Sequence, residues 1–134
     1  MPPAELKLGL SLYPQQTSWD QLATVARRAD QLGFDSLWTW DHLVGIGRAG
    51  TQPVFEAWTT AAATAAITTR ATIGLLVSAN TFRNPGLVAK SAVTVDHISG
   101  GRFVLGLGAA YRELEHGAHG IDFGSGFEIG RAHV

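Results

Sequence analysis

Two adjacent polar residues, Asp41 and His42, directly follow the hydrophobic run SLWTW at residues 36–40. A carboxylate beside an imidazole is able to move protons near neutral pH, which is general acid–base chemistry. A turn or a helix cap with an imidazole at the surface explains the same pair, and it is the commoner case when the pair is considered alone. The pair is therefore a candidate site only if the fold places it beside other functional groups.

Small residues follow two further hydrophobic runs. Residues 77–80 read VSAN, and Gly108 begins the segment GAA at residues 108–110. A glycine followed by alanines lets a flat ring or a phosphate approach the backbone, and a tight turn needs the same residues. The segment GLGAAY also resembles a dinucleotide fingerprint, but its third glycine is absent and it does not follow the first strand. A nicotinamide cofactor is therefore only weakly indicated.

Two other groups of polar residues invite functional interpretations. Glu113, Glu115, His116 and His119 suggest a metal site, yet their spacing matches no standard metal motif. Charged residues on a solvated helix explain them better, so we predict no metal. Arg83 precedes the start of a predicted helix, where it either binds an anion or lies on the surface with its stem packed.

The elements that position these residues alternate along the chain. Short hydrophobic runs predict strands, and capping residues followed by apolar residues at helical spacing predict helices. The strands are expected at residues 6–13, 34–40, 71–79 and 102–108, and the helices at residues 18–32, 54–69 and 84–99. Ser18 with Gln21 forms a capping box, Asn84 with Pro85 starts the third helix, and Gly33 ends the first.

This alternation predicts an α/β fold with parallel strands joined by right-handed crossovers. In such folds, ligands bind at the carboxyl ends of the strands, where the connecting loops converge. Asp41 and His42, residues 77–80 and residues 108–110 each follow a strand, so we expect them on one rim. A glycine-rich loop, Leu43 to Pro53, also starts there, and loops of this length often carry function.

Composition limits the partners. The chain has 134 residues, of which 46% are hydrophobic and 16% charged, so it forms one folded domain. Its formal charge of −1, without a basic cluster, favours a small-molecule substrate over nucleic acid or a membrane. The absence of cysteine excludes a disulfide framework and a cysteine nucleophile. With no signal peptide or membrane-spanning segment evident, we predict a cytoplasmic location.

Two long blocks of the sequence resemble a known family. LGFDSLWTWDHL, at residues 32–43, and the segment from TIGLLVSANTFRNP to GAHGIDF, at residues 72–123, are similar to the luciferase-like monooxygenase superfamily, in its branch of deazaflavin-dependent oxidoreductases. The resemblance covers residues 8–123 nearly continuously. It implies a TIM barrel that binds coenzyme F420 or FMN at its carboxyl rim and transfers a hydride to or from a small organic substrate.

The resemblance also implies roles for the first pair of residues. Asp41 and His42 match the pair near the deazaflavin ring, with His42 as a candidate acid/base or substrate contact. The blocks DHL and FRNP…DHISGGR favour F420 over FMN, and an FMN-dependent luciferase-like monooxygenase is the alternative. Ala110 stands where the family usually has glycine. The whole parent protein is expected to be a homo-oligomer.

Further cofactor contacts follow from the same resemblance. The bond between Leu76 and Val77 matches a position where family members commonly carry a non-proline cis peptide behind the ring. Ser78, Gly108 and Ala109 match backbone and hydroxyl contacts to the ring and its ribityl chain. These five residues, with Asp41, make up the predicted cofactor site.

A TIM barrel needs eight βα units and about 250 residues, whereas this chain supplies about four units. We therefore expect residues 1–127 to be the N-terminal half of a barrel, inactive by itself and with open strand edges. The alternative is a non-catalytic half-barrel that dimerises. Residues 128–134, EIGRAHV, show no helix or strand pattern and match the translation of a common sequencing adapter, so we expect a non-native tail.

Overall fold

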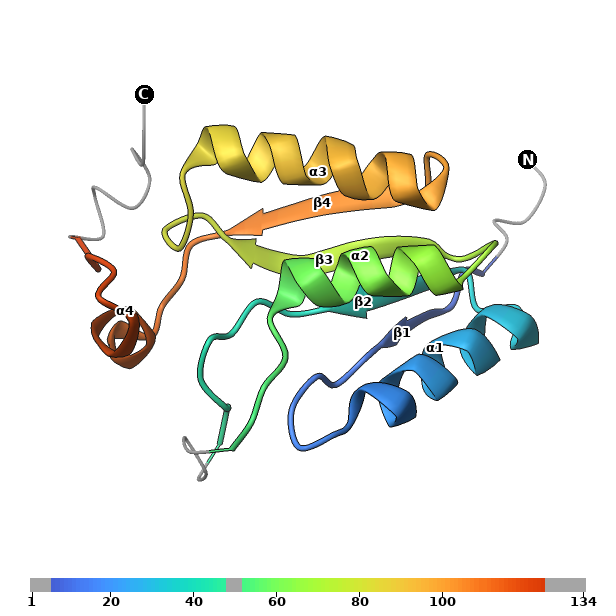
Figure 1. Ribbon diagram of the computed structural model, residues 1–134, viewed down its shortest axis with the longest axis horizontal. Coiled ribbons are helices and arrows are strands. Elements are labelled where there is room, and N and C mark those ends of the chain that lie inside the picture. The colour runs from blue at the N-terminus through green and yellow to red at the C-terminus, as the bar shows by residue number, and fades with distance from the viewer. Residues whose placement is uncertain (1–5, 48–51, 125–134) are drawn as a thin grey trace.

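A computed structural model describes residues 6–47 and 52–124, so the expected tail at residues 128–134 lies outside the described part. Four strands form one parallel sheet in the order β1-β2-β3-β4 (Figure 1). The elements are β1 (Gly9–Ser11), α1 (Trp19–Leu32), β2 (Ser36–Thr39), α2 (Ala57–Ile67), β3 (Thr72–Ala79), α3 (Pro85–Ser99), β4 (Phe103–Gly108) and α4 (Glu113–His119). The predicted βα alternation is therefore confirmed.

Local capping sets the ends of the helices. In α1, the Ser18 hydroxyl accepts from the backbone N–H of Gln21, and the Gln21 side chain accepts from the N–H of Ser18. Gly33 ends this helix at a φ of 96°. Asn84 caps α3 by accepting from the N–H of Gly86. These predictions are confirmed because capping depends only on residues a few positions apart.

Helix α2 starts three residues later than predicted. The Glu56 carboxylate accepts from the N–H groups of Trp58 and Thr59, which makes Glu56 the capping residue. The alanines of this helix then face the sheet, with Ala57, Ala61 and Ala65 at 0–1% exposure. Because alanine has no side chain beyond Cβ, α2 packs closely against its neighbours.

The helices α1, α2 and α3 cover one face of the sheet (Figure 1). Leu37, Ile73 and Leu75 point to this face and are almost fully buried. They form the hydrophobic core with the alanines of α1 and α2 and with Val88 and Val95 of α3. Side chains alternate along a strand, so residues at the intervening positions lie on the opposite face.

On the opposite face, Trp38 of β2 packs over β3. Trp38 lies over Gly74 so closely that a Cβ at Gly74 would be 2.2 Å from the indole ring. Its Nε1 donates to the Ser36 hydroxyl at 2.8 Å. Val104 of β4, which pairs with Gly74, remains 44% exposed on this face. Within the described residues, β1 and β4 each pair with one strand only, so both edges of the sheet are open, as predicted.

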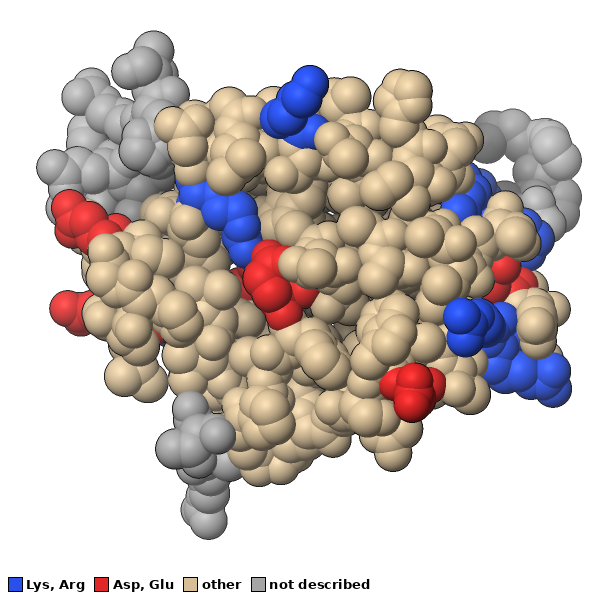
Figure 2. Space-filling view, in the orientation of Figure 1, with Lys and Arg blue, Asp and Glu red and all other residues tan. Residues whose placement is uncertain are grey.

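Charge is scattered over the molecular surface. On the face shown in Figure 2, Lys and Arg side chains lie interspersed with Asp and Glu, and no large region of one sign is visible. Among the described residues, no helix has both the length and the apolar character needed to cross a bilayer.

Candidate active site

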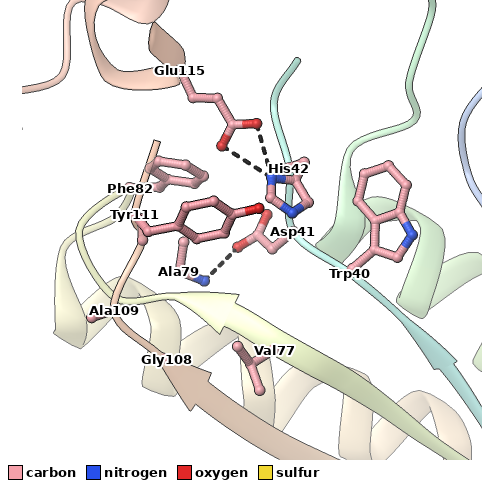
Figure 3. A pocket seen from close by; sticks show the side chains of 11 residues that line it. Trp40, Asp41, His42, Val77, Ala79, Phe82, Gly108, Ala109, Tyr111 and Glu115 are labelled. Atoms are coloured by element: carbon pink, nitrogen blue, oxygen red, sulfur yellow. Dashed lines mark hydrogen bonds and ion pairs between the residues drawn. The ribbon is translucent and has the colours of Figure 1, made fainter. Parts of the chain in front are cut away.

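A cavity of about 70 Å³ lies at the carboxyl ends of the strands (Figure 3). The ends of β3 and β4 and the segments that follow β2, β3 and β4 line it, together with one residue of α4. Its lining residues are Trp40, Asp41, His42, Val77, Ala79, Phe82, Gly108, Ala109, Ala110, Tyr111 and Glu115. Five of the seven predicted site residues are therefore brought together here, while Leu76 and Ser78 are not part of the lining.

The cavity is small for a cofactor site. Pockets for cofactors and other small molecules usually measure about 300–1,000 Å³. The lining residues come from the ends of only three strands and from α4. The described residues therefore do not enclose a space of that size.

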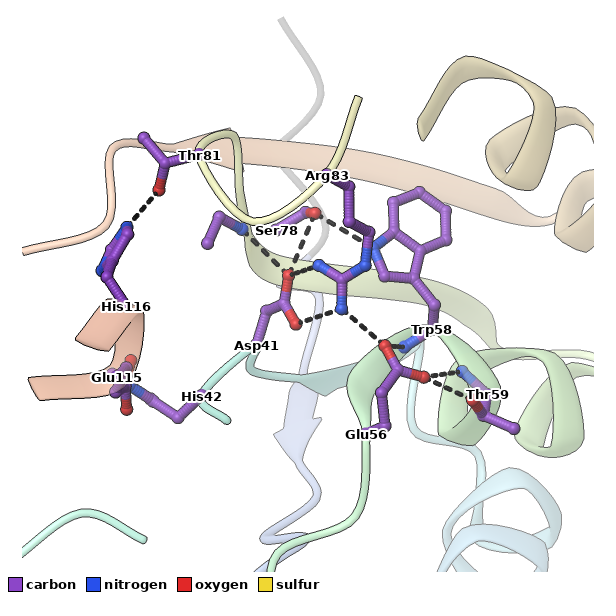
Figure 4. Close-up of polar contacts among 11 residues, drawn as sticks. Asp41, His42, Glu56, Trp58, Thr59, Ser78, Thr81, Arg83, Glu115 and His116 are labelled. Carbon is purple, nitrogen blue, oxygen red and sulfur yellow. Dashed lines mark hydrogen bonds and ion pairs between the residues drawn. The ribbon is translucent and has the colours of Figure 1, made fainter. Parts of the chain in front are cut away.

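Asp41 is held by four hydrogen bonds from the chain itself (Figure 4). Its Oδ2 accepts from the Ser78 hydroxyl at 3.2 Å, the Ala79 N–H at 3.0 Å and Arg83 Nη1 at 2.5 Å. Its Oδ1 accepts from Arg83 Nη2 at 3.0 Å. The Asp41 side chain is fully buried. Asp41 thus fastens the end of β2 to the end of β3, immediately beside His42.

Arg83 joins this carboxylate to a second one. Its Nη2 donates to Glu56 Oε1 at 2.6 Å as well as to Asp41. Burial alone would lower the pKa of Arg83, but the hydrogen bonds and charges of Asp41 and Glu56 outweigh burial and raise it. Both interpretations of Arg83 from the sequence are wrong, because its side chain is largely buried and its charge is paired with carboxylates of the chain.

Glu56 both caps α2 and pairs with Arg83. Burial would raise its pKa, but hydrogen bonds from Thr59 and Trp58 and the charge of Arg83 together lower it. The Trp58 indole Nε1 also donates to the Ser78 hydroxyl at 3.1 Å, and Ser78 is completely buried. The start of α2 is thereby connected to the ends of β2 and β3.

His42 stands at the cavity with its ring held on three sides. Its Nδ1 lies 2.9 Å from Oε1 and 3.2 Å from Oε2 of Glu115 (Figure 3). The rings of Trp40 and Tyr111 meet the imidazole edge-on, with centroid distances of 5.1 Å and 6.0 Å. Arg112 Nη1 donates to the same Glu115 Oε1 at 2.9 Å. The imidazole is therefore oriented while 21% of its side chain remains exposed.

The expectation of a solvated charged helix at residues 113–119 is wrong for two of its members. Glu115 and His116 are 1% and 0% exposed, because α4 folds back over the rim. Glu115 pairs with His42, and His116 Nε2 lies 2.8 Å from the Thr81 hydroxyl (Figure 4). Among the described residues, no cluster of three or more His, Cys, Asp or Glu side chains has the arrangement of a metal site.

The segment around Val77 forms the apolar part of the wall. The bond between Leu76 and Val77 is cis, as the family resemblance implied. Val77 is 39% exposed, and a Cβ at Gly108 would lie only 2.5 Å from its Cγ2. Glycine at 108 is therefore required by contact with Val77. The alanines at 109 and 110 follow it directly along the cavity.

Sequence reasoning missed the roles of three residues in this region. Phe82 lines the cavity, Glu115 holds His42, and Glu56 caps α2 while pairing with Arg83. The three-residue spacing of Arg112 and Glu115 is the sequence signal that could have revealed their ion pair. Phe82 begins the block FRNP that supports the family resemblance, and Glu56 lies within the helix predicted at residues 54–69, but no pattern assigned either residue to a site.

Comparison with known proteins identifies the family. The luciferase-like monooxygenase family model matches residues 6–131. An F420-dependent glucose-6-phosphate dehydrogenase from Intrasporangium calvum is 38% identical over 119 residues, which cover 86% of this chain and 35% of the relative. The 4-hydroxyprotoasukamycin monooxygenase of Streptomyces nodosus subsp. asukaensis is 34% identical, and the match covers 81% of this chain and 28% of the relative. The chain thus spans about a third of the length of these curated relatives.

Solved structures show the same fold. An F420-dependent secondary alcohol dehydrogenase in complex with an F420-acetone adduct superposes with a TM-score of 0.81 at 24% identity, covering 94% of this chain and 38% of that enzyme. A second neighbour is the oxygenating constituent of 3,6-diketocamphane monooxygenase from Pseudomonas putida, in complex with FMN. It superposes with a TM-score of 0.75 at 21% identity, covering 95% of this chain and 37% of that enzyme. These neighbours are TIM-barrel enzymes, so the parallel sheet described above corresponds to part of a barrel. The chain belongs to the luciferase-like monooxygenase family.

Proposed function

We propose that this chain is part of an oxidoreductase that transfers a hydride between coenzyme F420 and a small organic substrate. The observation that carries the proposal is the imidazole of His42, oriented by a buried carboxylate at an apolar wall where three strands end. The relatives named as F420-dependent enzymes support F420 over FMN, because several of them are 31–38% identical to this chain.

The wall fits a flat cofactor ring. Val77 and Ala109 present short apolar side chains, and Val77 packs directly on Gly108. Trp40 and Tyr111 stand at the side of the wall that carries His42 (Figure 3). When bound, the deazaflavin ring supplies the carbon that accepts or donates the hydride. Apolar contacts around such a ring exclude water from the reacting atoms.

His42 is the residue that we expect to move a proton. Its side chain reaches the cavity, and an imidazole serves as acid or base near neutral pH. Asp41 has a different task in this proposal. Its oxygens already accept four hydrogen bonds from the chain, so it holds the strand ends and keeps His42 in place. Ser78 supports Asp41 from the buried side.

Chemical-shift mapping of the ¹⁵N-labelled chain with F420 and, separately, with FMN tests the cofactor. This method detects binding with a dissociation constant as high as the millimolar range, so it can follow a cofactor that contacts only one wall of its site. We expect F420 to shift the amide signals of Ala79, Gly108 and Ala109. The bulkier Ala109→Leu variant should weaken binding at least about tenfold, which corresponds to ~1.4 kcal/mol. Ala66→Leu is the matched control, because Ala66 is exposed on α2, away from the cavity.

Each outcome of this titration decides a different point. Shifts at the three residues with FMN alone would replace the proposal by the FMN-dependent alternative. Shifts with neither cofactor, or equal weakening by both variants, would contradict the placement of a ring on this wall. Because the described residues form one wall only, we also propose that the 134-residue chain does not turn over substrate by itself.

One observation favours the second candidate, a non-catalytic half-barrel that dimerises. In the described part of the chain, β1 and β4 have open edges, and Val104 is 44% exposed on the face that the helices do not cover. Light scattering coupled to size-exclusion chromatography measures the mass of the purified chain. A discrete dimer supports this candidate, and a monomer contradicts it. The homo-oligomeric state of the whole protein and its cytoplasmic location stay predictions from the sequence.

A further inference from the structure

The contact between His42 and Glu115 determines more than the position of a ring. An ionised carboxylate only accepts hydrogen bonds, so the nitrogen that faces it must carry a hydrogen. Both Glu115 oxygens face Nδ1 of His42, at 2.9 Å and 3.2 Å. A neutral imidazole carries one hydrogen, so Nε2 is left with a free lone pair.

The surroundings of Glu115 keep its carboxylate in this orientation. Its side chain is only 2% exposed, and Arg112 Nη1 donates to Oε1 at 2.9 Å. Arg112 also lies near the carbonyl oxygens of Val44 and Gly45, both at 3.4 Å, which connects α4 to the loop after β2. Glu115 is thereby placed between a permanent donor and His42.

The other groups around the His42 ring leave Nε2 accessible to a reactant. In Figure 3, Nδ1 turns toward Glu115 and the second ring nitrogen turns away from it. Trp40 and Tyr111 contact the imidazole edge-on and restrict its rotation. A rotation of the ring that reversed the two nitrogens would lose the pairing with Glu115.

We propose that Glu115, held by Arg112, is a positioning residue that fixes His42 in the tautomer with hydrogen on Nδ1 and so makes Nε2 the atom that exchanges a proton with the substrate. The proton exchange at Nε2 rests on the proposed function, whereas the assignment of the tautomer does not. A buried carboxylate that selects the tautomer of a catalytic imidazole is an established arrangement in other enzymes.

Nitrogen-15 NMR of the histidine rings tests the tautomer directly in the 134-residue chain. Protonated and unprotonated ring nitrogens have well-separated shifts, and the spectrum is recorded at a pH at which the rings are neutral. A His42→Asn variant assigns the signals of residue 42. We expect wild-type His42 to show a protonated Nδ1 and an unprotonated Nε2. The opposite pattern would overturn the proposal.

The variant Glu115→Gln tests the cause. Arg112 would keep the amide oxygen, so the amide NH₂ group would face Nδ1 and donate to it, and the ring hydrogen would move to Nε2. We expect the two nitrogen shifts of His42 to exchange. Glu113→Gln is the matched control, since Glu113 is exposed on the same helix and undergoes the same charge change. It should leave both shifts unchanged.

The outcomes separate this inference from the proposed function. A folded Glu115→Gln variant with the wild-type tautomer would refute the role of Glu115. If that variant does not fold, the wild-type spectrum still decides the tautomer. Neither measurement needs a cofactor or a substrate, so a failure to bind F420 leaves the result readable.

Discussion

Replacing Arg83 by methionine should destabilise the fold strongly, because it leaves Asp41 buried without its cationic partner. The Asp41 side chain is 0% exposed and that of Arg83 16%, so water cannot replace the guanidinium at the strand ends. Removing one partner of a buried ion pair costs about 3–5 kcal/mol. A domain's whole free energy of unfolding is about 5–15 kcal/mol, so the Arg83→Met variant should lose a large part of it.

Urea unfolding followed by circular dichroism measures this loss, and a double-mutant cycle assigns it to the pair. Asp41→Asn removes the carboxylate charge, so the double variant should be less destabilised than the sum of the single variants by about 1–3 kcal/mol. Arg28→Met is the control, because Arg28 is exposed on α1 and should change the free energy of unfolding by no more than about 0.5 kcal/mol.

Two results would refute the reasoning. One is a loss below about 1 kcal/mol for Arg83→Met, which is the range of an exposed ion pair. The other is additivity of the two single variants, which would mean that Asp41 and Arg83 are not coupled in solution.

Other predictions concern packing, buried hydrogen bonds and pH. Gly74→Ala should lower the free energy of unfolding by about 1–3 kcal/mol and displace Trp38, because the new Cβ would lie 2.2 Å from the indole ring. Urea unfolding measures the loss of stability, and tryptophan emission measures the displacement. Gly117→Ala is the control, because the space around Gly117 is open. Asp30→Asn should cost about 1–3 kcal/mol, because Asp30 accepts from the N–H groups of Thr69, Arg70 and Ala71; an equally small effect from Asp30→Asn and from the exposed Asp20→Asn would contradict it. Burial would raise the pKa of Asp30 and of Glu56, but hydrogen bonds lower both below their ordinary values of 3.8 and 4.5. These two groups therefore stabilise the fold fully above about pH 4.5, and their contribution is lost as the pH falls through the lowered pKa values. The urea midpoint should fall below that pH, and Glu56→Gln should make the fall shallower.

Local signals explain what could be predicted from the sequence. Ser18 with Gln21, Asn84 with Pro85, and Gly33 act on backbone groups within a few residues, so their types and spacing are sufficient to define the helix ends. The strands follow from short hydrophobic runs between these helices. The rim position of Asp41 and His42 follows in turn, because parallel strands joined by crossovers all end on one side of the sheet.

Long-range pairing explains what could not be predicted. Arg83 and Asp41 are separated by 42 residues, and Glu115 and His42 by 73. The sequence does not reveal that Arg83 pairs with Asp41 and Glu56, so it predicted an anion site or a surface position for this residue. Nothing in the charge pattern of residues 113–119 separates the buried Glu115 from the exposed Glu113.

The sequence by itself determined the order of strands and helices, the capping residues of α1 and α3, the family and the rim on which Asp41, His42, Val77 and Gly108 lie. Tertiary structure alone decided which of these side chains reach the cavity and which are used to hold it. Asp41 is paired inside the protein, whereas His42 is oriented by Glu115 and stays open. The physical reason is that a buried charge must find a partner, and only the packing of α2, α4 and the strand ends determines which partner is within reach.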